Sequence, residues 1–172
     1  KASLKNYKQK ITKPYVIAEI GSNFNQNFNK AKKLIKVASK CNASAVKFQL
    51  FKSEELYPDK KGLYKIFKEI ELNPKWIPKL KSFANSLGLD FIVSPFDMKS
   101  VDVLEKANLD IYKIASSETA NLSLVRYVAK KNKPIILSTG MCDMVDIEQA
   151  IEVIYNSGNT QVSLLQCGSI YP

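Results

Sequence analysis

Short apolar runs separated by helical stretches constrain the fold of this chain more than any other feature. Each run is brief, continuous and apolar rather than alternating, which is typical of strands buried on both faces of a parallel sheet. The runs lie at residues 15–18, 45–48, 91–93, 111–114, 134–137 and 162–165. We therefore expect six parallel strands.

The segments between these runs have helical periodicity. Apolar side chains share one face in each of three segments: Ala31, Leu34, Ile35 and Ala38; Ile77, Leu80, Ala84 and Leu87; Ile147, Ala150, Ile151 and Ile154. Gly88 and Gly158 follow two of these segments as helix stop signals, and Pro74 suits the first turn of a helix. Alternating strands and helices form either a barrel or a doubly wound sheet.

Polar residues at the strand ends favour the barrel. They follow every expected strand: Glu19 and Asn23; Lys47 and Gln49; Ser94; Lys113, Ser116 and Glu118; Ser138 and Thr139; Ser169 and Tyr171. A barrel gathers all its strand C-termini around one mouth, whereas an open sheet uses only those beside its switch point. We expect an α/β fold of the (β/α)₈ TIM-barrel type, with about six of the eight βα units present. Residues 1–172 would then be the N-terminal part of one barrel domain.

Composition excludes several classes of protein. No stretch approaches the roughly 20 apolar residues of a membrane span, and the N-terminus lacks the apolar core of a signal peptide. The net charge is +10, but the lysines are dispersed and form no stripe with interleaved aromatics, which argues against nucleic acid. The three cysteines contain no CxxC pair, so neither disulfides nor zinc are supported. We expect a cytoplasmic protein without membrane or nucleic-acid partners.

Two lysines lie inside apolar strands, Lys47 in Ala-Val-Lys-Phe-Gln and Lys113 in Ile-Tyr-Lys-Ile-Ala. A buried, unpaired ammonium is costly, so such a lysine normally meets a carboxylate or an anionic ligand. The alternative is a lysine that points outward beneath a helix with its ammonium in water. Hydroxyl residues follow Lys113 and recur after the next strand, which favours a phosphate group as the ligand.

Two carboxylates, Glu19 and Glu118, end different strands, where they would hold sugar hydroxyls or transfer protons. Either one alone could be a structural cap. A glycosidase needs paired carboxylates but no phosphate site, so the lysines argue against it. A Schiff-base aldolase with Lys113 or Lys47 as its nucleophile remains an alternative, as does a sugar-phosphate binding protein without activity.

Together these motifs resemble the N-acetylneuraminate (sialic acid) synthases and their legionaminate and pseudaminate relatives. The similarity runs from about Tyr15 to Pro172. Its motifs are Ile-Ala-Glu-Ile-Gly-Ser-Asn from residue 17, Ala-Val-Lys-Phe-Gln from 45, Ser-Pro-Phe-Asp from 94, Tyr-Lys-Ile-Ala-Ser-Ser-Glu from 112, Leu-Ser-Thr-Gly-Met from 137 and Leu-Gln-Cys-Gly-Ser-Ile-Tyr-Pro from 165. Several motifs in order at barrel spacing are far more specific than any one of them.

The resemblance implies a condensation of phosphoenolpyruvate with an N-acetylmannosamine-like sugar. Phosphoenolpyruvate would be bound by Lys47, Ser94, Lys113, Ser116, Ser138 and Ser169. The sugar would be contacted by Glu19, Gln49, Glu118 and Tyr171. The catalytic residues would be Glu19, Lys113 and Glu118.

The family also uses Mn²⁺ or Mg²⁺, held by histidines of the later strands, and this chain contains no histidine. We therefore expect no metal ligand within the chain. The family's C-terminal antifreeze-like domain, which helps to build the partner's active site in a homodimer, is also expected to be missing. The chain departs from the family at Phe24, where histidine is usual, at Gln26, where glycine is usual, and at Ser94, where threonine is common. It also has Gly168-Ser169-Ile170 in place of a Thr-Ser/Asn-x pattern.

Overall fold

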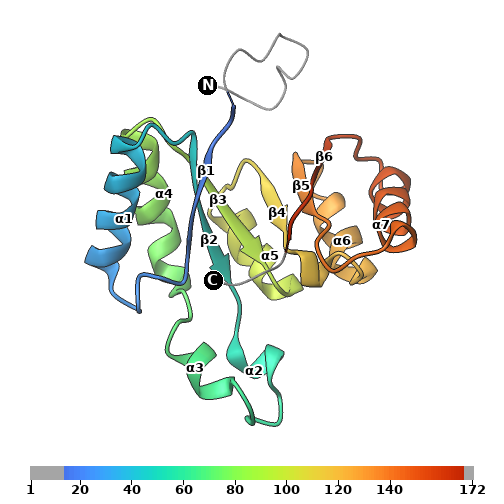
Figure 1. Cartoon of the computed structure of the whole chain (residues 1–172), viewed down its shortest axis with the longest axis horizontal. Coiled ribbons are helices and arrows are strands. Elements are labelled where there is room, and N and C mark those ends of the chain that lie inside the picture. Colours follow the sequence, from blue (N-terminus) through green and yellow to red (C-terminus); the bar gives the residue numbers. More distant parts are fainter. Residues whose placement is uncertain (1–13, 169–172) are drawn as a thin grey trace.

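A six-stranded parallel sheet forms the centre of the molecule in the computed structural model, which describes residues 14–168 (Figure 1). The strands follow one another across the sheet in chain order, β1 to β6. They are β1 (Ile17–Gly21), β2 (Ala45–Leu50), β3 (Asp90–Pro95), β4 (Tyr112–Ile114), β5 (Ile135–Ser138) and β6 (Val162–Leu165). All six predicted strands are present, but the first begins at Ile17, so Tyr15 and Val16 precede it.

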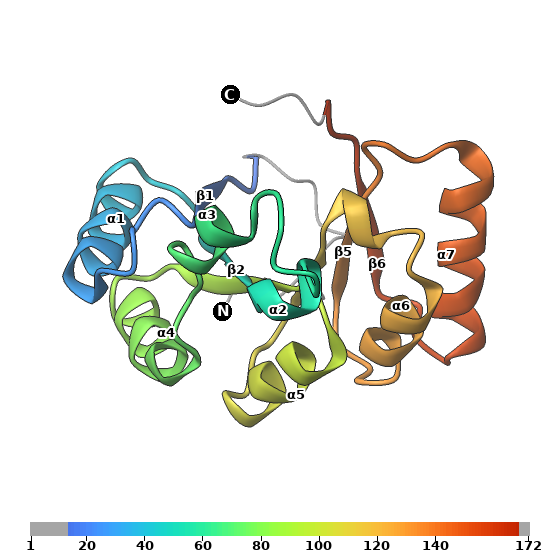
Figure 2. The same ribbon diagram turned by 90° about the horizontal axis from the view of Figure 1, so that it is seen from below.

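Five helices return the chain from one strand to the next. They are α1 (Phe28–Lys40), α4 (Ile77–Ser86), α5 (Met98–Lys106), α6 (Leu122–Ala129) and α7 (Met144–Asn156). All five lie along the outer face of the curved sheet (Figure 2). Shorter elements interrupt two connections: α2 (Ser53–Leu56), α3 (Tyr64–Lys68) and the 3₁₀ turn η2 (Pro74–Trp76) after β2, and the 3₁₀ turn η3 (Ser116–Glu118) after β4.

The glycine and proline residues that the sequence indicates as helix boundaries do lie at helix boundaries. Gly88 and Gly158 follow the C-cap residues of α4 and α7 and adopt φ of +76° and +83°, a backbone conformation that glycine adopts without strain. Pro74 opens η2, where its missing N–H costs no hydrogen bond. The apolar faces of α1, α4 and α7 pack on the sheet, burying Ala31, Ile35, Leu80, Ala84, Ala150 and Ile154.

The two faces of the sheet have different cores. The outer face carries the larger one, in which strand residues such as Val46, Phe48 and Val93 pack against the helices. The inner face carries a small apolar layer of Ala45, Ile92, Ile111 and Ile136. Because successive residues of a strand point to opposite faces, the residues two positions beyond these lie on the inner face as well.

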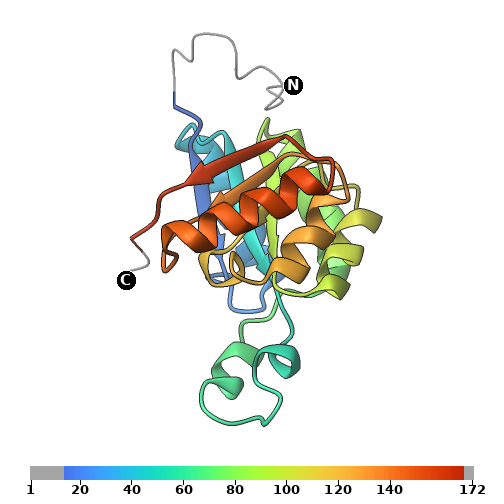
Figure 3. The same ribbon diagram turned by 90° about the vertical axis from the view of Figure 1, so that its right-hand side faces the viewer.

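β1 and β6 are the edges of the described sheet. In Figure 3, β6 crosses the side of the molecule that faces the viewer. Val16, just before β1, and Leu164 and Leu165 in β6 are exposed. The sequential order contains no switch point, which is the arrangement a barrel needs. Among the described residues, no helix combines the length and apolarity needed to cross a membrane.

Candidate anion and sugar site

A layer of polar side chains lies directly above the small apolar layer on the inner face of the sheet. Lys47 and Ser94 come two residues after Ala45 and Ile92, and Lys113 and Ser138 come two residues after Ile111 and Ile136. All four polar residues are at least nine-tenths buried. Alternation along four neighbouring strands therefore brings together side chains that are far apart in sequence.

Lys47 lies between a carboxylate and a hydroxyl. Its Nζ forms an ion pair with Glu19 Oε2 and lies 3.4 Å from the Oγ of Ser94. The register of β1 and β2 places Glu19 directly beside Lys47, and the side chain of Glu19 is about half exposed. The expectation that a strand lysine meets a carboxylate is confirmed for Lys47.

The turn after Glu19 depends on glycine. Gly21 has φ of +54°, in the region that disfavours other residues, and the ladder shifts register between Glu19 and Gly21. A Cβ on Gly21 would lie 3.3 Å from Glu19 Oε1. Glycine therefore leaves room for the carboxylate of Glu19 at the end of β1.

Lys113 is 5% exposed, and its ammonium is held by neutral groups. Its Nζ donates to the Oγ of Ser138 and to the carbonyl oxygen of Ile114 at 3.0 Å. Burial, with a smaller contribution from the positive charge of Lys47, lowers the pKa of Lys113 to about 8. Neither lysine points outward beneath a helix, so that alternative is wrong for both.

The segment after β4 carries Ser116 and Glu118 in the single turn η3. The carboxylate of Glu118 accepts hydrogen bonds from Ser117 Oγ and Asn121 Nδ2, both at 3.2 Å. Glu118 is partly exposed. Both partners are close in sequence, so these contacts also agree with the alternative that Glu118 is a structural cap of its own turn.

Two residues beside this layer were not singled out from the sequence for a role in the site. Cys167 Sγ lies 3.3 Å from Ser138 Oγ, and Thr119 Oγ1 donates to the Ser138 carbonyl oxygen at 2.6 Å. No motif or spacing signals either contact, since each depends on the arrangement of β5 with its neighbours. Gln49 lies at the end of β2 on the inner face, beside Ser94 in the register, and is partly buried. Ser169 and Tyr171 lie outside the described residues.

The first loop accommodates the two departures from the family pattern that lie within it, Phe24 and Gln26. Phe24 is fully buried and packs against Phe48 and Trp76, with ring centroids 5.8 and 6.4 Å apart. Gln26 has φ of +49°, a conformation that glycine adopts more readily, and its Nε2 donates to the Lys68 carbonyl at 2.6 Å. Phe24 therefore serves the core, and the Gln26 side chain joins the loop to α3.

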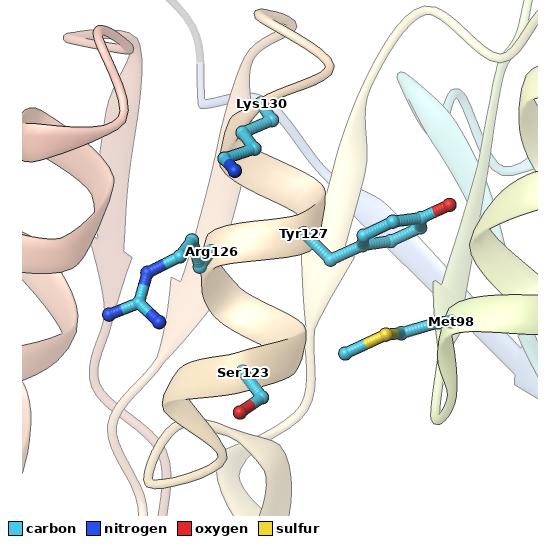
Figure 4. Close-up of a pocket in the computed structure, with 5 residues that line it drawn as sticks. All are labelled: Met98, Ser123, Arg126, Tyr127 and Lys130. Carbon is cyan, nitrogen blue, oxygen red and sulfur yellow. The ribbon is translucent and has the colours of Figure 1, made fainter.

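Two hollows lie outside the polar layer. One, of about 220 Å³, is lined by Met98, Ser123, Arg126, Tyr127 and Lys130. Figure 4 shows Met98 and Tyr127 between α5 and α6, with Arg126 on the other side of α6. The second, of about 580 Å³, lies between the first loop and the segment that runs from the end of α3 into η2, where Lys52 and Lys68 are paired with Glu71.

The described residues contain no group of three or more histidine, cysteine, aspartate or glutamate side chains placed to hold a metal ion. The chain also has no histidine. The residues described here therefore do not fit the metal that the resemblance implies, and its ligands would have to come from elsewhere in a longer protein.

The strand ends of this parallel α/β sheet gather two buried lysines and two buried serines beside a carboxylate, an arrangement typical of an enzyme pocket at the C-terminal ends of parallel strands. The chain belongs to the NeuB family, whose model matches residues 34–172. This confirms the resemblance to the sialic acid synthases and their relatives.

Known proteins similar to this chain include synthases of nine-carbon sugar acids. The chain is 38% identical to the N,N'-diacetyllegionaminic acid synthase of Campylobacter jejuni, over 94% of this chain and 53% of that protein. It is 42% identical to an uncharacterized protein of Methanocaldococcus jannaschii, over 92% of this chain and 47% of that protein. The crystal structure of the sialic acid synthetase of Leptospira borgpetersenii, in complex with citrate, matches with a TM-score of 0.87 at 31% identity. That match covers 92% of this chain and 55% of the synthetase. The chain thus spans about half the length of the relatives it matches.

Proposed function

We propose that this chain supplies the phosphoenolpyruvate site and part of the sugar site of a synthase that condenses phosphoenolpyruvate with N-acetylmannosamine or a related amino sugar. The products are a nine-carbon 2-keto-3-deoxy sugar acid and inorganic phosphate. The observation that carries this proposal is the pair of buried lysines, Lys47 and Lys113, on one inner face among serine hydroxyls. Membership of a family of sugar-acid synthases supports it.

The polar layer suits the two anionic groups of phosphoenolpyruvate. Its phosphate and carboxylate need two cations and several hydroxyl donors, which Lys47, Lys113, Ser94 and Ser138 provide at the floor of the site. In this proposal Ser116 and Ser169 complete the anion contacts. The charge of the ligand also supplies what Lys113 lacks among its described partners, a negatively charged group.

The sugar lies on the more exposed side, against Glu19, Gln49, Glu118 and Tyr171. C3 of phosphoenolpyruvate attacks the aldehyde carbon of the open-chain sugar and forms the new C–C bond. Water adds at C2, and the C–O bond to phosphate then breaks, which releases phosphate and leaves the keto group. In this proposal Glu19 and Glu118 exchange protons with the sugar oxygens and the attacking water. The complete synthase would be a cytoplasmic homodimer.

Mn²⁺ or Mg²⁺ would polarise the aldehyde in the complete synthase. Among the described residues no group of side chains is placed to hold that ion. The role of this chain is to bind the anion, orient the sugar and move protons.

Phosphate release by the full-length protein tests the proposal. We expect release only when phosphoenolpyruvate and an N-acetylated amino sugar are both present, with N-acetylmannosamine and 2,4-diacetamido sugars as the first candidates. Release without sugar would contradict the proposed reaction. Tight phosphoenolpyruvate binding without turnover on any such sugar would instead support a binding protein without activity.

A Schiff-base aldolase is the second candidate, and the lowered pKa of Lys113 favours it, because a neutral amine is the nucleophile in that chemistry. Borohydride reduction in the presence of pyruvate separates the two. An aldolase would gain the mass of a trapped adduct on a lysine. We expect no adduct, because the lysines of the proposed synthase bind charge and form no covalent bond.

A further inference from the structure

Thr119 is a buried polar residue next to the proposed site for which the proposed reaction gives no role. It is fully buried, although Ala120 beside it is exposed. Its Oγ1 lies 2.6 Å from the carbonyl oxygen of Ser138 and 3.3 Å from that of Ala115. The shorter contact crosses from the segment after β4 to the end of β5.

This hydrogen bond joins the two sides of the site. On one side it reaches the backbone of Ser138, whose side-chain hydroxyl accepts a hydrogen bond from the ammonium of Lys113. On the other side Thr119 directly follows Glu118 in the chain, and its backbone N–H donates to the carbonyl oxygen of Ser116 at 3.3 Å. A second link runs in parallel, from Cys142 Sγ to the Ser116 carbonyl at 3.7 Å.

The two partners of the bond differ in how firmly they are held. β5 lies between β4 and β6 and is hydrogen-bonded to both. The turn η3 is only three residues long, and a single 3₁₀ turn has little stability of its own. Loss of the bond would therefore move the turn that carries Glu118 and leave the strand end in place.

We propose that Thr119 is a positioning residue that fixes the turn with Ser116 and Glu118 against the end of β5, so that the sugar side of the site keeps its distance from the anion side. This inference rests on the proposed function. Its side chain touches neither substrate; it acts through the two backbone segments that it joins.

Two substitutions separate the hydroxyl from the packing of the side chain. Thr119→Val keeps the branched shape and removes the donor, whereas Thr119→Ser keeps the donor and removes a buried methyl group. Both should lower the melting temperature of the full-length protein by a few degrees, roughly 2–4 °C. Only Thr119→Val should lower kcat with the sugar, by about tenfold, the effect of losing one buried hydrogen bond. Its affinity for phosphoenolpyruvate should stay within about threefold, because Lys47, Lys113 and Ser138 remain in place.

Hydrogen exchange supplies a readout that does not require turnover. The amides of Glu118, Thr119 and Asn121 bond to Ala115, Ser116 and Glu118 within the turn. These amides should exchange faster in Thr119→Val and at nearly the wild-type rate in Thr119→Ser, with β5 unchanged in both.

The outcomes distinguish this inference from the proposed function. An active wild-type protein with Thr119→Val at wild-type kcat, or with Thr119→Ser equally impaired, overturns the positioning role. If the wild type lacks activity, the proposed function fails, and hydrogen exchange alone decides: a turn loosened only in Thr119→Val supports the role, and an unchanged turn overturns it.

Discussion

At the scale of single residues, Lys113 is the side chain whose chemistry depends most on its ligand. Its ammonium is buried beside Lys47 and bonded to a hydroxyl and a carbonyl. Lys113→Ala should reduce turnover at least about 100-fold, as removal of a charge-stabilising donor does elsewhere. Its free energy of unfolding should fall by no more than about 1 kcal/mol, a typical change for a point substitution. Steady-state kinetics and urea unfolding measure both, with the exposed Lys106→Ala as control. Turnover near wild type would remove Lys113 from the site.

The lowered pKa of Lys113 predicts how anion binding depends on pH. Its charged form predominates below pH 8 and disappears as the pH rises through about 8. A bound anion favours the charged form of Lys113, so binding near pH 8 should take up a proton, and affinity should fall above that pH. Calorimetry with phosphoenolpyruvate in two buffers of different ionisation enthalpy measures this uptake. Affinity independent of pH from 7 to 9.5, without proton uptake, would contradict the assignment.

The same pKa shift affects stability in the opposite sense. Because the unfolded chain holds the Lys113 proton up to a higher pH than the folded protein, stability due to this group rises between about pH 8 and its unfolded pKa of about 10.4. The contribution is unfavourable below pH 8, where folding buries the charge. A ligand-binding role therefore explains this lysine better than a stabilising one.

Glu19→Gln separates the two sides of the site. The carboxylate is paired with Lys47, so its loss leaves that lysine more available to an anionic ligand. Phosphoenolpyruvate affinity should hold within a few-fold or improve, whereas turnover should fall at least tenfold, on the order of one lost proton-transfer group. Fluorescence or calorimetric titration with phosphoenolpyruvate measures the affinity, and the phosphate assay measures turnover. Loss of phosphoenolpyruvate binding in this variant would show that Glu19 serves the anion side.

At the scale of elements, the buried carboxylate of Glu71 joins both ends of the segment that runs from α2 to α3. Glu71 accepts the Ser53 backbone N–H at 2.8 Å and pairs with Lys52 at 3.2 Å and Lys68 at 3.4 Å. Burial raises the pKa of Glu71, but these partners outweigh it and the net pKa is lowered. The stabilisation is therefore complete above the ordinary glutamate pKa and is lost as the pH falls through the lowered value.

Glu71→Gln should loosen this segment without affecting the sheet. The amides of residues 53–68 should exchange on the order of tenfold faster, the effect of losing one charged hydrogen-bond partner, whereas β2 and β3 stay protected. The exposed Glu69→Gln is the matched control and should leave exchange unchanged. Equal protection in Glu71→Gln and Glu69→Gln would show that the segment is held by its apolar contacts instead.

Local signals predicted most of the elements. Apolar runs placed the six strands, and Gly88 and Gly158 marked the ends of α4 and α7 because glycine adopts a positive φ without strain. Asn42, Asn108 and Asn132 take the same conformation after α1, α5 and α6, and these helix ends were not predicted. The two strand lysines were identified from the cost of burying a charge. The first loop could not be predicted, since burial of Phe24 depends on Trp76, which is distant in sequence. For the same reason no pattern indicated Thr119 or Cys167, whose contacts exist only once β4, β5 and β6 lie side by side.

At the scale of the whole molecule, the two sheet edges are the main unpaired surfaces of the described part. Val16, Leu164 and Leu165 are 48%, 51% and 41% exposed. A parallel sheet needs cover on both faces and its edges pair readily with other strands. Residues 1–172 expressed alone should therefore self-associate and lack activity, which sedimentation velocity and the phosphate assay measure. A monodisperse monomer that releases phosphate only when sugar is present would show that the six strands suffice.

The fate of the bridging oxygen of phosphoenolpyruvate tests the central claim, that this site serves a condensation with C–O cleavage. The measurement uses the full-length protein with phosphoenolpyruvate carrying ¹⁸O between C2 and phosphorus, and mass spectrometry of the released phosphate. We predict that the label appears in phosphate only when the amino sugar is present, and that the nine-carbon acid carries none. Label retained in the organic product would mean P–O cleavage and would contradict the account.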